Sequence, residues 1–396
     1  MTFKITHQDN KARVGQLETA HGTIETPFFM PVLTKGTGKL ISPDDYQIPE
    51  TKAIICNALL LSLRPGTDIL EKAGGIHQFI NLNKIIFTDC GGFQMSRSIF
   101  ELKSKRGLHF RNPYDQNKII LTPKKIMEIQ LKIGSDVAMM LDDMSSHGAS
   151  FEEAKKAMEN THRWGEESLK WHQELRKEYS NNNCKENNKI NNNQNNENND
   201  NNDNNNSRQL LFGIIQGNFF PELRKESALF LSKLEFDGFA IGGVAIGEPK
   251  EDMYLAVDSA IPHLPLEKPR YVMGVGSPEE LLELISRGVD CFDSVYPTQT
   301  ARHHTLFTKN GRINIDQSKY SNDFTPIEND CGCHTCKNFT KAYLNHLCRI
   351  KEPAGKRLRS IHNVYFILKL MEEAKNAIKE NRFVEFKNNF MKNFSK

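Results

Sequence analysis

The chain has 396 residues, and its 52 Lys and Arg nearly balance its 49 Asp and Glu, for a formal net charge of +3. This balance excludes a uniformly basic surface, so any contact with nucleic acid must come from a local patch. No apolar run approaches the roughly 18 residues of a membrane helix, and residues 1–14 lack the apolar core of a signal peptide. We therefore expect a cytoplasmic protein without a membrane span.

Eight short apolar segments alternate with amphipathic helical stretches, a pattern typical of parallel sheets built from β-α-β units. They cover residues 28–33, 53–59, 84–89, 137–142, 210–216, 238–244, 270–276 and 290–296. Eight such strands predict an α/β fold, the (β/α)8 TIM barrel, whose active site lies at the carboxyl ends of the strands. A doubly wound open sheet is the rival, but no strand is followed by the glycine fingerprint of a dinucleotide-binding fold.

Three of these strands end in aspartates, namely Asp89, Asp142 and Asp293. Each could simply shape a turn or cap a helix. Because the carboxyl ends of barrel strands share one face, we predict one site, where one carboxylate attacks the anomeric carbon of a sugar and another acts as acid or base. Gln216 and the glycines at 242–243 would offer an amide and a close backbone approach to a flat heterocycle, although tight strand packing explains the glycines equally well.

Residues 180–207 are dominated by asparagine and contain too few apolar side chains to offset the entropy of ordering them. We predict a disordered insertion there, between a helical segment over 150–179 and the strand that starts at 210. A connection from helix to strand lies on the barrel face opposite the active site. A neutral insertion is therefore preferred to an aggregation-related role.

A cysteine cluster with C-x-C-x2-C spacing lies after the last strand and could wrap one tetrahedral Zn²⁺ ion. The three thiols belong to Cys331, Cys333 and Cys336, and the fourth ligand could be His334, His346 or His362. Four protein ligands leave no open position, so we expect one structural zinc ion per chain; free thiols are the alternative. We assign residues 325–365 to a zinc-binding subdomain inserted near the C-terminus of a single barrel domain over residues 1–396.

The motifs of the chain resemble those of the tRNA-guanine transglycosylases, also called queuine tRNA-ribosyltransferases. The similarity runs from about residue 11 to the end, with the asparagine tract as an insertion. The matching motifs occupy residues 88–94, 110–113, 212–217, 242–243, 273–276 and 292–302. The resemblance also selects His362, within residues 360–363, as the fourth zinc ligand.

This resemblance implies a pentosyltransferase of queuosine biosynthesis that exchanges guanine at wobble position 34 of GUN-anticodon tRNAs for a 7-deazaguanine, queuine or preQ1. Its substrates would be the tRNAs that carry aspartate, asparagine, histidine or tyrosine. By matching motif, Asp293 would be the nucleophile that forms a covalent enzyme-RNA intermediate, and Asp89 the general base. The residues that bind the base would be Asp142, Gln216, Gly243, Phe93 and Met273, the last two on its faces. The residues that contact RNA would be Gly274, Val275, Gly276, Ser277, Pro278, Glu279, Glu280, Thr298, Gln299, Thr300, Ala301 and Arg302.

The sequence departs from the family pattern at Cys90, where a serine is usual, at Gln299, where an arginine is usual, and over residues 57–61. The last change affects the expected support of the site and the subunit interface. Residues 244–248 are similar to bacterial members, whose bulk there suits preQ1, whereas an asparagine tract is more typical of AT-rich eukaryotic genomes. Both bases therefore stay open.

The alternative function is a non-catalytic partner subunit of the same fold, which would bind tRNA or the catalytic subunit. The expected assembly is a homodimer or a heterodimer with a non-catalytic paralogue. A metal-dependent hydrolase is disfavoured, because the strand ends carry carboxylates where such enzymes need histidines. Two basic segments, residues 103–106 and 351–359, could neutralise RNA phosphates or be ordinary solvated faces.

Overall fold

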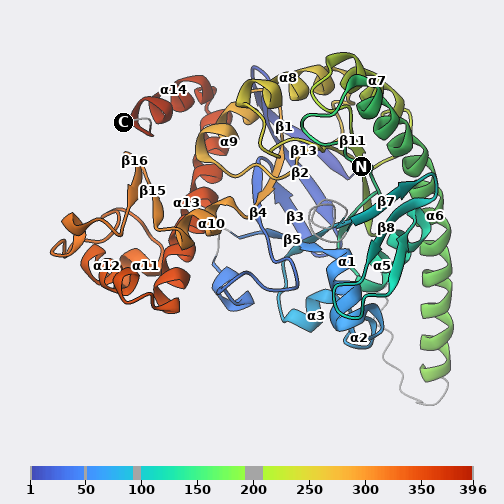
Figure 1. The fold of residues 1–396 in the computed structure, drawn as a ribbon, viewed down its shortest axis with the longest axis horizontal. Coiled ribbons are helices and arrows are strands. Elements are labelled where there is room, and N and C mark those ends of the chain that lie inside the picture. Colours follow the sequence, from blue (N-terminus) through green and yellow to red (C-terminus); the bar gives the residue numbers. More distant parts are fainter. Residues whose placement is uncertain (1, 49–50, 92–99, 192–207, 395–396) are drawn as a thin grey trace.

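The computed structural model describes residues 2–48, 51–91, 100–191 and 208–394. Its centre is a sheet of eight parallel strands in the order β4-β14-β13-β12-β11-β10-β6-β5 (Figure 1). The strands are β4 (Phe28–Pro31), β5 (Ala53–Asn57), β6 (Ile85–Asp89), β10 (Val137–Met139), β11 (Leu210–Ile215), β12 (Gly238–Ile241), β13 (Arg270–Val272) and β14 (Cys291–Ser294). Each lies within one of the eight predicted segments.

The sheet closes into a barrel because the chain beyond β4 pairs with β5. Leu33 N–H donates to the Ile55 carbonyl at 2.8 Å, and Asn57 N–H donates to the Thr34 carbonyl at 3.0 Å. Val32 forms a parallel bridge to Ile55. The predicted TIM barrel is therefore confirmed.

All strands except β6 end before the predicted apolar runs do. At two of these places the chain turns into the left-handed region, at Gly243 (φ +66°) and Gly274 (φ +81°), which ends the extended conformation. The residues released from the sheet include Asp142, Gln216 and Met273. These three site candidates thus lie just beyond the strand ends, where side chains can leave the sheet plane.

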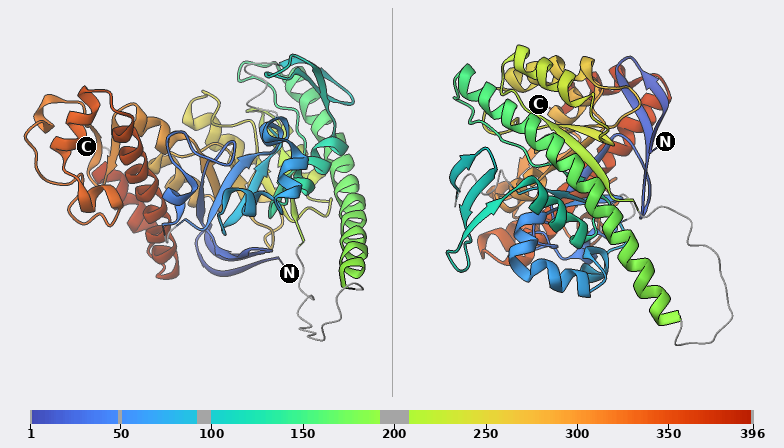
Figure 2. Two further views of the ribbon diagram at one scale, coloured as in Figure 1. Left: turned by 90° about the horizontal axis from the view of Figure 1, so that it is seen from below. Right: turned by 90° about the vertical axis from the view of Figure 1, so that its right-hand side faces the viewer.

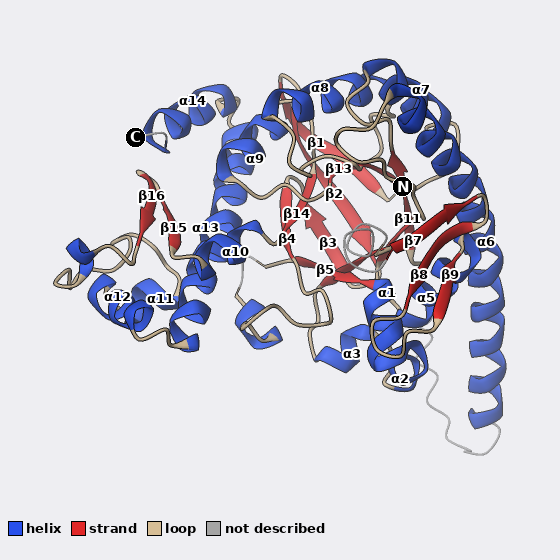
Figure 3. Cartoon of the chain, viewed as in Figure 1, coloured by secondary structure: helices blue, strands red, loops and turns tan. Residues whose placement is uncertain are grey.

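Helices pack around the barrel, as the views in Figures 2 and 3 show. They are α1 (Ala58–Leu61), α2 (Thr67–Lys72), α3 (Ile76–Ile80), α5 (Pro123–Ile133), α6 (Phe151–Asn191), α7 (Pro221–Leu231), α8 (Lys250–Ala260), α9 (Pro278–Ile285) and α10 (Tyr296–Arg302), with shorter turns at η1 (Pro43–Tyr46), η2 (Ser62–Gly66) and η3 (Ile261–His263). Among the described helices, none combines the length and the apolar composition that crossing a bilayer requires.

The expectation of a disordered asparagine-rich tract is wrong for its first part, which belongs to helix α6. The helix runs from Phe151 to Asn191 and so includes residues 180–191, which we had assigned to a disordered insertion. Those residues contain neither Gly nor Pro. Extending an existing helix through them needs no new nucleation, so poor helix formers are tolerated. The remainder of the tract, residues 192–207, lies outside the described residues.

Two antiparallel sheets that the sequence did not predict flank the barrel. The first, made of β1 (Phe3–Asp9), β2 (Ala12–Thr19) and β3 (Gly22–Glu25), lies at the amino ends of the barrel strands. The second is inserted after β6 and consists of β7 (Phe100–Ser104), β8 (Gly107–Arg111) and β9 (Lys118–Leu121).

A C-terminal lobe packs beside the barrel and has its own hydrophobic core. Its elements are β15 (Thr305–Thr308), β16 (Gly311–Asn314), η4 (Ser318–Tyr320), α11 (His334–Asn338), α12 (Lys341–Arg349) and the start of α13 (Pro353–Lys379), which α14 (Phe383–Phe394) follows. The core of this lobe extends from Leu306 to Leu358. In Figure 1 the lobe lies on the side of the barrel opposite α6.

Candidate active site

The structure brings the three predicted aspartates to one end of the barrel. Asp89 is the last residue of β6, Asp142 follows β10, and Asp293 lies in β14. Tyr271 in β13 interacts with two of them. Its hydroxyl bonds to Asp293. Burial raises the pKa of Tyr271 well above the ordinary value, and so do the charge of Asp293 and, less strongly, that of Asp89. The Tyr271 hydroxyl therefore stays protonated at neutral pH and can act as a hydrogen-bond donor.

Asp293 is half-buried and receives both of its hydrogen bonds on one oxygen. Tyr271 Oη donates to Oδ1 at 2.5 Å, and Gly274 N–H donates to the same atom at 2.9 Å. Burial raises the pKa of Asp293 above its ordinary value, although these two donors act in the opposite direction. Among the described residues, no Lys or Arg forms an ion pair with this carboxylate. The other oxygen, Oδ2, has no hydrogen bond within the described part of the chain.

Asp142 lies within a small polar cluster built from three strand ends. Gln216 Nε2 donates to its Oδ2 at 2.6 Å, and the Cys90 thiol donates to its Oδ1 at 3.4 Å. Burial raises the pKa of Asp142, against the lowering effect of these two bonds. The neighbouring Asp143 is used differently, since Lys103 of β7 pairs with it at 2.5 Å. Asp142, unlike Asp143, thus has no ion pair with a described Lys or Arg, and both of its oxygens accept hydrogen bonds.

The glycines after β12 allow the chain to approach the Gln216 amide. A Cβ at Gly242 would lie 2.7 Å from Gln216 Nε2, and one at Gly243 would lie 2.6 Å from Oε1. Any side chain at either position would displace this amide. The close contacts of both glycines are thus with neighbouring side chains, Gln216 and, for Gly242, also Ile214 at 2.7 Å, while a close backbone approach to a heterocycle stays a prediction.

Arg224 of α7 supports the candidate site through backbone contacts that sequence reasoning missed. It is buried, and its guanidinium donates to the carbonyls of Asn218 at 2.6 Å, Ile215 at 2.9 Å and Gly242 at 2.8 Å. Burial lowers its pKa to about 9. One cation thus fixes the backbone that carries the base-binding candidates from β11 and β12.

The segment proposed to distinguish the two bases is braced by Glu248. Its carboxylate accepts from Ala245 N–H at 2.5 Å and from Ile246 N–H at 2.8 Å. Ala245 adopts a left-handed conformation (φ +57°), which is unusual for a residue with a Cβ. Of the two residues expected on the faces of the base, Met273 is half-buried beyond β13, and Phe93 lies outside the described residues.

The first predicted RNA-binding segment, residues 274–280, is mostly inaccessible in this conformation. Its exposed member is Gly274, while the next four residues are buried. Glu279 forms a bidentate ion pair with Arg312, with both distances 2.6 Å, and Glu280 pairs with Lys250 at 3.3 Å. The second predicted segment forms helix α10 directly after the Asp293 strand, with Gln299 exposed and Ala301 buried.

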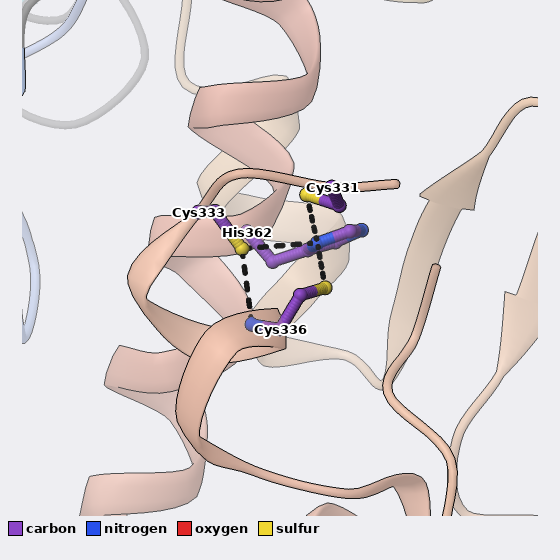
Figure 4. Close-up of side chains that lie close together, drawn as sticks. All are labelled: Cys331, Cys333, Cys336 and His362. Carbon is purple, nitrogen blue, oxygen red and sulfur yellow. Dashed lines mark hydrogen bonds between the residues drawn. The ribbon is translucent and has the colours of Figure 1, made fainter. Parts of the chain in front are cut away.

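The cysteine cluster is confirmed as a possible metal site, with His362 as its fourth member. Side-chain donor atoms of Cys331, Cys333, Cys336 and His362 lie within 4.8 Å of one another (Figure 4). His362 Nδ1 is 3.4 to 3.8 Å from the three sulfurs. These distances match a tetrahedral zinc site, in which bond lengths of about 2.0 to 2.3 Å place sulfur and nitrogen ligands roughly 3.5 Å apart.

The surroundings of His362 also fit a metal ligand. Its Nε2–H donates to the Phe307 carbonyl at 2.8 Å, which leaves the unprotonated Nδ1 facing the thiols. His334, an alternative ligand, instead lies near Asn338 on the exposed face of α11. His362 lies well inside α13, so its position is fixed by helical turns on both sides.

Helix α13 connects the cysteine cluster to the segment that follows Asp293. Asn363, next to the zinc-ligand candidate, donates to the carbonyls of Pro297 at 3.1 Å and Thr305 at 3.0 Å. One turn earlier, Arg359 Nε donates to the Ala301 carbonyl at 3.0 Å. A metal ion at the cluster would therefore stiffen the support of α10 without touching the aspartates.

Comparison with known proteins gives one consistent result. A family model described as queuine tRNA-ribosyltransferase matches residues 8–396. A queuine tRNA-ribosyltransferase of Caldanaerobacter subterraneus is 42% identical over 389 residues, covering 97% of this chain and 94% of the relative. The protein of the same name from Bacillus licheniformis is 43% identical over 384 residues, covering 97% and 93%, and that from Bacillus subtilis is 42% identical with the same coverage.

Proposed function

The chain belongs to the queuine tRNA-ribosyltransferase family, and on this premise we propose that it exchanges guanine for a 7-deazaguanine at wobble position 34 of GUN-anticodon tRNAs. The activity is that of a pentosyltransferase. The observation that carries the proposal is the Asp293 carboxylate, which has one oxygen held by two donors and the other without a bond among the described residues.

The first half of the reaction breaks the bond between the ribose and guanine. Asp293 Oδ2 attacks C1′ of the ribose while the electron pair of the C1′–N9 bond leaves with guanine, and a covalent enzyme-RNA intermediate forms. Burial raises the free energy of the carboxylate anion before reaction, and formation of the new bond removes that charge. Tyr271 and Gly274 hold Oδ1 and so orient Oδ2.

The second half attaches the new base. Asp89 removes a proton from the incoming 7-deazaguanine at N9, N9 attacks C1′, and Asp293 leaves as a carboxylate. In the first half the same Asp89 carboxyl, protonated, would give its proton to the departing guanine. Asp89 thus carries the proton and Asp293 carries the ribose, and these steps need no metal ion.

The base itself would be read by Asp142, Gln216 and Gly243, with Phe93 and Met273 on its two faces. The amide and carboxylate already bond to each other, so they present a fixed set of donors and acceptors to the edge of the base. The Gly243 φ of +66° exposes backbone at the same place. Zn²⁺ bound by Cys331, Cys333, Cys336 and His362 would supply structural stability to the lobe that supports α10.

The proposal is tested by incubating the purified chain with a GUN-anticodon tRNA and labelled guanine, and then with preQ1 or queuine. We expect guanine exchange and a denaturant-resistant enzyme-RNA complex. Asp293→Ala should abolish this complex with folding unchanged, whereas Asp252→Ala on the outer helix α8 should behave as the wild type. Covalent capture that persists in Asp293→Ala would contradict the assigned nucleophile.

The same experiment separates the open alternatives. Preference for preQ1 would assign base discrimination to residues 244–248, while preference for queuine would show that the site has room for the larger base. A folded wild-type chain that exchanges none of the three bases would instead support the non-catalytic partner subunit. Measurement of molecular mass in solution, alone and with a paralogue, decides between homodimer and heterodimer.

A further inference from the structure

A basic surface cavity lies at the outer side of the β7–β9 sheet, away from the strand ends. Its volume is about 490 Å³, and it is lined by Lys105, Arg106, Thr122, Lys124, Arg163 and Glu167. Three elements contribute: the turn between β7 and β8, the start of α5, and α6. Four cations thus face one carboxylate in a chain that is nearly neutral overall.

These four cations are available to an external anion. Among the described residues, none of them forms an ion pair with a carboxylate. Lys105, Arg106 and Lys124 are exposed. Arg163 donates from Nη2 to Asn160 at 2.5 Å, while its buried Nε has no hydrogen-bond partner. Four cations around one carboxylate, without an ion pair in the described part of the chain, concentrate positive potential at this cavity.

The cavity walls are held in place by buried contacts. Trp164, which is fully buried in α6, donates from its indole nitrogen to the Lys105 carbonyl at 3.1 Å. Gly107 has a φ of +153°, and a Cβ there would lie 2.0 Å from the Leu121 carbonyl oxygen, so the turn is pressed tightly against β9. The turn that carries Lys105 and Arg106 therefore has a fixed position.

The same hairpin connects the cavity to the active site. Lys103, two residues before Lys105 on β7, bonds to Asp143 and to the Met144 carbonyl, directly after the base-binding candidate Asp142. In Figure 1, β7 and β8 run from the barrel towards α6, on the side opposite the C-terminal lobe. An RNA whose ribose lies at Asp293 could therefore continue along this hairpin.

We infer that this basic surface binds the sugar-phosphate backbone of the same tRNA, at nucleotides outside the exchanged base. A phosphodiester backbone carries repeated negative charges, which match several cations around one open, polar cavity. The start of α5 at this cavity also favours an anion. The inference rests on the proposed function, because it takes tRNA as the substrate. It places a second contact surface on the barrel side away from α10.

The test compares Lys105→Ala/Arg106→Ala with the wild type in equilibrium tRNA binding over a series of KCl concentrations. The matched control is Lys4→Ala/Lys11→Ala, which removes two exposed lysines from the β1–β2 hairpin at the amino end of the barrel. We expect the first variant to bind about tenfold more weakly at low salt, and the slope of log K against log salt to fall by roughly one to two. The control should keep the wild-type slope.

Binding of the full tRNA and of a short anticodon stem-loop locates the contact. A loss for both RNAs places it on the anticodon stem, and a loss for the full tRNA alone places it on a more distant arm; either supports the inference. An unchanged Kd and slope, or an equal loss in the control, overturns it. Wild-type tRNA binding without base exchange would reject the proposed function, while the binding comparison still decides the role of the surface.

Lys124→Ala gives an independent check from another wall of the cavity, since it alters α5 and leaves the hairpin intact. We expect a smaller loss of affinity, roughly threefold, with the slope reduced by about one. Its thermal unfolding should stay close to that of the wild type, because the side chain is exposed. The substitution removes a described ring contact with Trp171, and such a contact at an exposed site contributes little to stability.

Discussion

The two ends of strand β14 carry aspartates with opposite environments. At the amino end, Asp290 accepts from Arg13 Nε at 2.9 Å, Arg13 Nη2 at 2.5 Å and Arg270 N–H at 2.7 Å, and it is fully buried. At the carboxyl end, the donors to Asp293 in the described part of the chain are both neutral, from Tyr271 and Gly274. A cation neutralises the first carboxylate. No described cation neutralises the second, whose partner in the proposed reaction is the positive charge that develops on the ribose.

Strand β10 repeats this contrast. Asp136 precedes the strand and accepts bonds from His21, His77 and Ile86 N–H. Burial acts to raise the pKa of Asp136, but these bonds outweigh it and hold the pKa well below the usual range. Asp142 follows the strand, and its pKa is raised. The comparison teaches that burial alone does not distinguish the site candidates: Asp290 and Asp136 receive bonds from Arg or His side chains, and among the described residues Asp293 and Asp142 do not.

The largest expected effect is on Asp293. Asp293→Asn keeps a neutral acceptor for Tyr271 and Gly274 but removes the nucleophile, so guanine exchange should fall by at least about 10³-fold. Because burial disfavours the charged form, the free energy of unfolding should stay equal or rise at neutral pH. Exchange assays and denaturant unfolding on the same sample measure both; a clear loss of stability would contradict the assignment.

Asp290→Asn should show the reverse result. It leaves the Arg13 guanidinium buried without its carboxylate, and breaking a buried ion pair typically lowers the free energy of unfolding by about 3 to 5 kcal/mol. Exchange by the fraction that remains folded should stay close to wild type, since Asp290 is at the other end of the strand. Urea unfolding measures the stability, and activity below the unfolding range serves as the control.

Arg224 is a buried cation at the carboxyl ends of the strands. The contrast between the two barrel ends therefore holds for the aspartates and not for every charged residue. Arg224→Lys keeps the charge but cannot bond to the carbonyls of Asn218, Ile215 and Gly242 together. We expect a loss of about 2 kcal/mol in unfolding free energy and a roughly tenfold higher KM for the free base, with a smaller change in kcat. A purely structural role would lower stability and leave that KM unchanged.

The barrel and the three aspartates were predictable because their signals are local. An apolar run that ends in an acid is visible in one stretch of sequence, and so is a C-x-C-x2-C spacing. Arg224 gives no such signal, since it lies in α7 at a place where a helix commonly exposes a charged residue. Its burial depends on carbonyls from β11 and β12 that meet it only in the folded chain.

The amino-end clusters were hidden for the same reason. His21, His77 and Asp136 are separated by more than fifty residues at each step along the chain, and nothing near any of them predicts the other two. The strands β1 to β3 that bring His21 to the barrel mix polar with apolar residues, unlike the buried strands. Continuation of α6 to Asn191 was missed because composition predicts disorder, whereas an adjoining helix can extend into such residues.

The smallest expected effect concerns His21, whose ring stacks on that of His77 at 3.5 Å and bonds to Asp136 at 2.8 Å. The bond to Asp136 raises the pKa of His21, against the lowering effect of burial. Its contribution to stability is therefore fully present below the unfolded pKa, near pH 6.5, and is lost as pH rises through the folded pKa.

His21→Gln should accordingly cost more stability at pH 5.5 than at pH 8, by less than about 1 kcal/mol because the ring is partly exposed to solvent. His77 also bonds to this carboxylate, and the lowered pKa of Asp136 keeps that group ionised throughout this pH range. Unfolding of both proteins at the two pH values measures the difference. A loss of unfolding free energy that is larger at pH 8 than at pH 5.5 would contradict this prediction. Base exchange by His21→Gln should equal that of the wild type at both pH values.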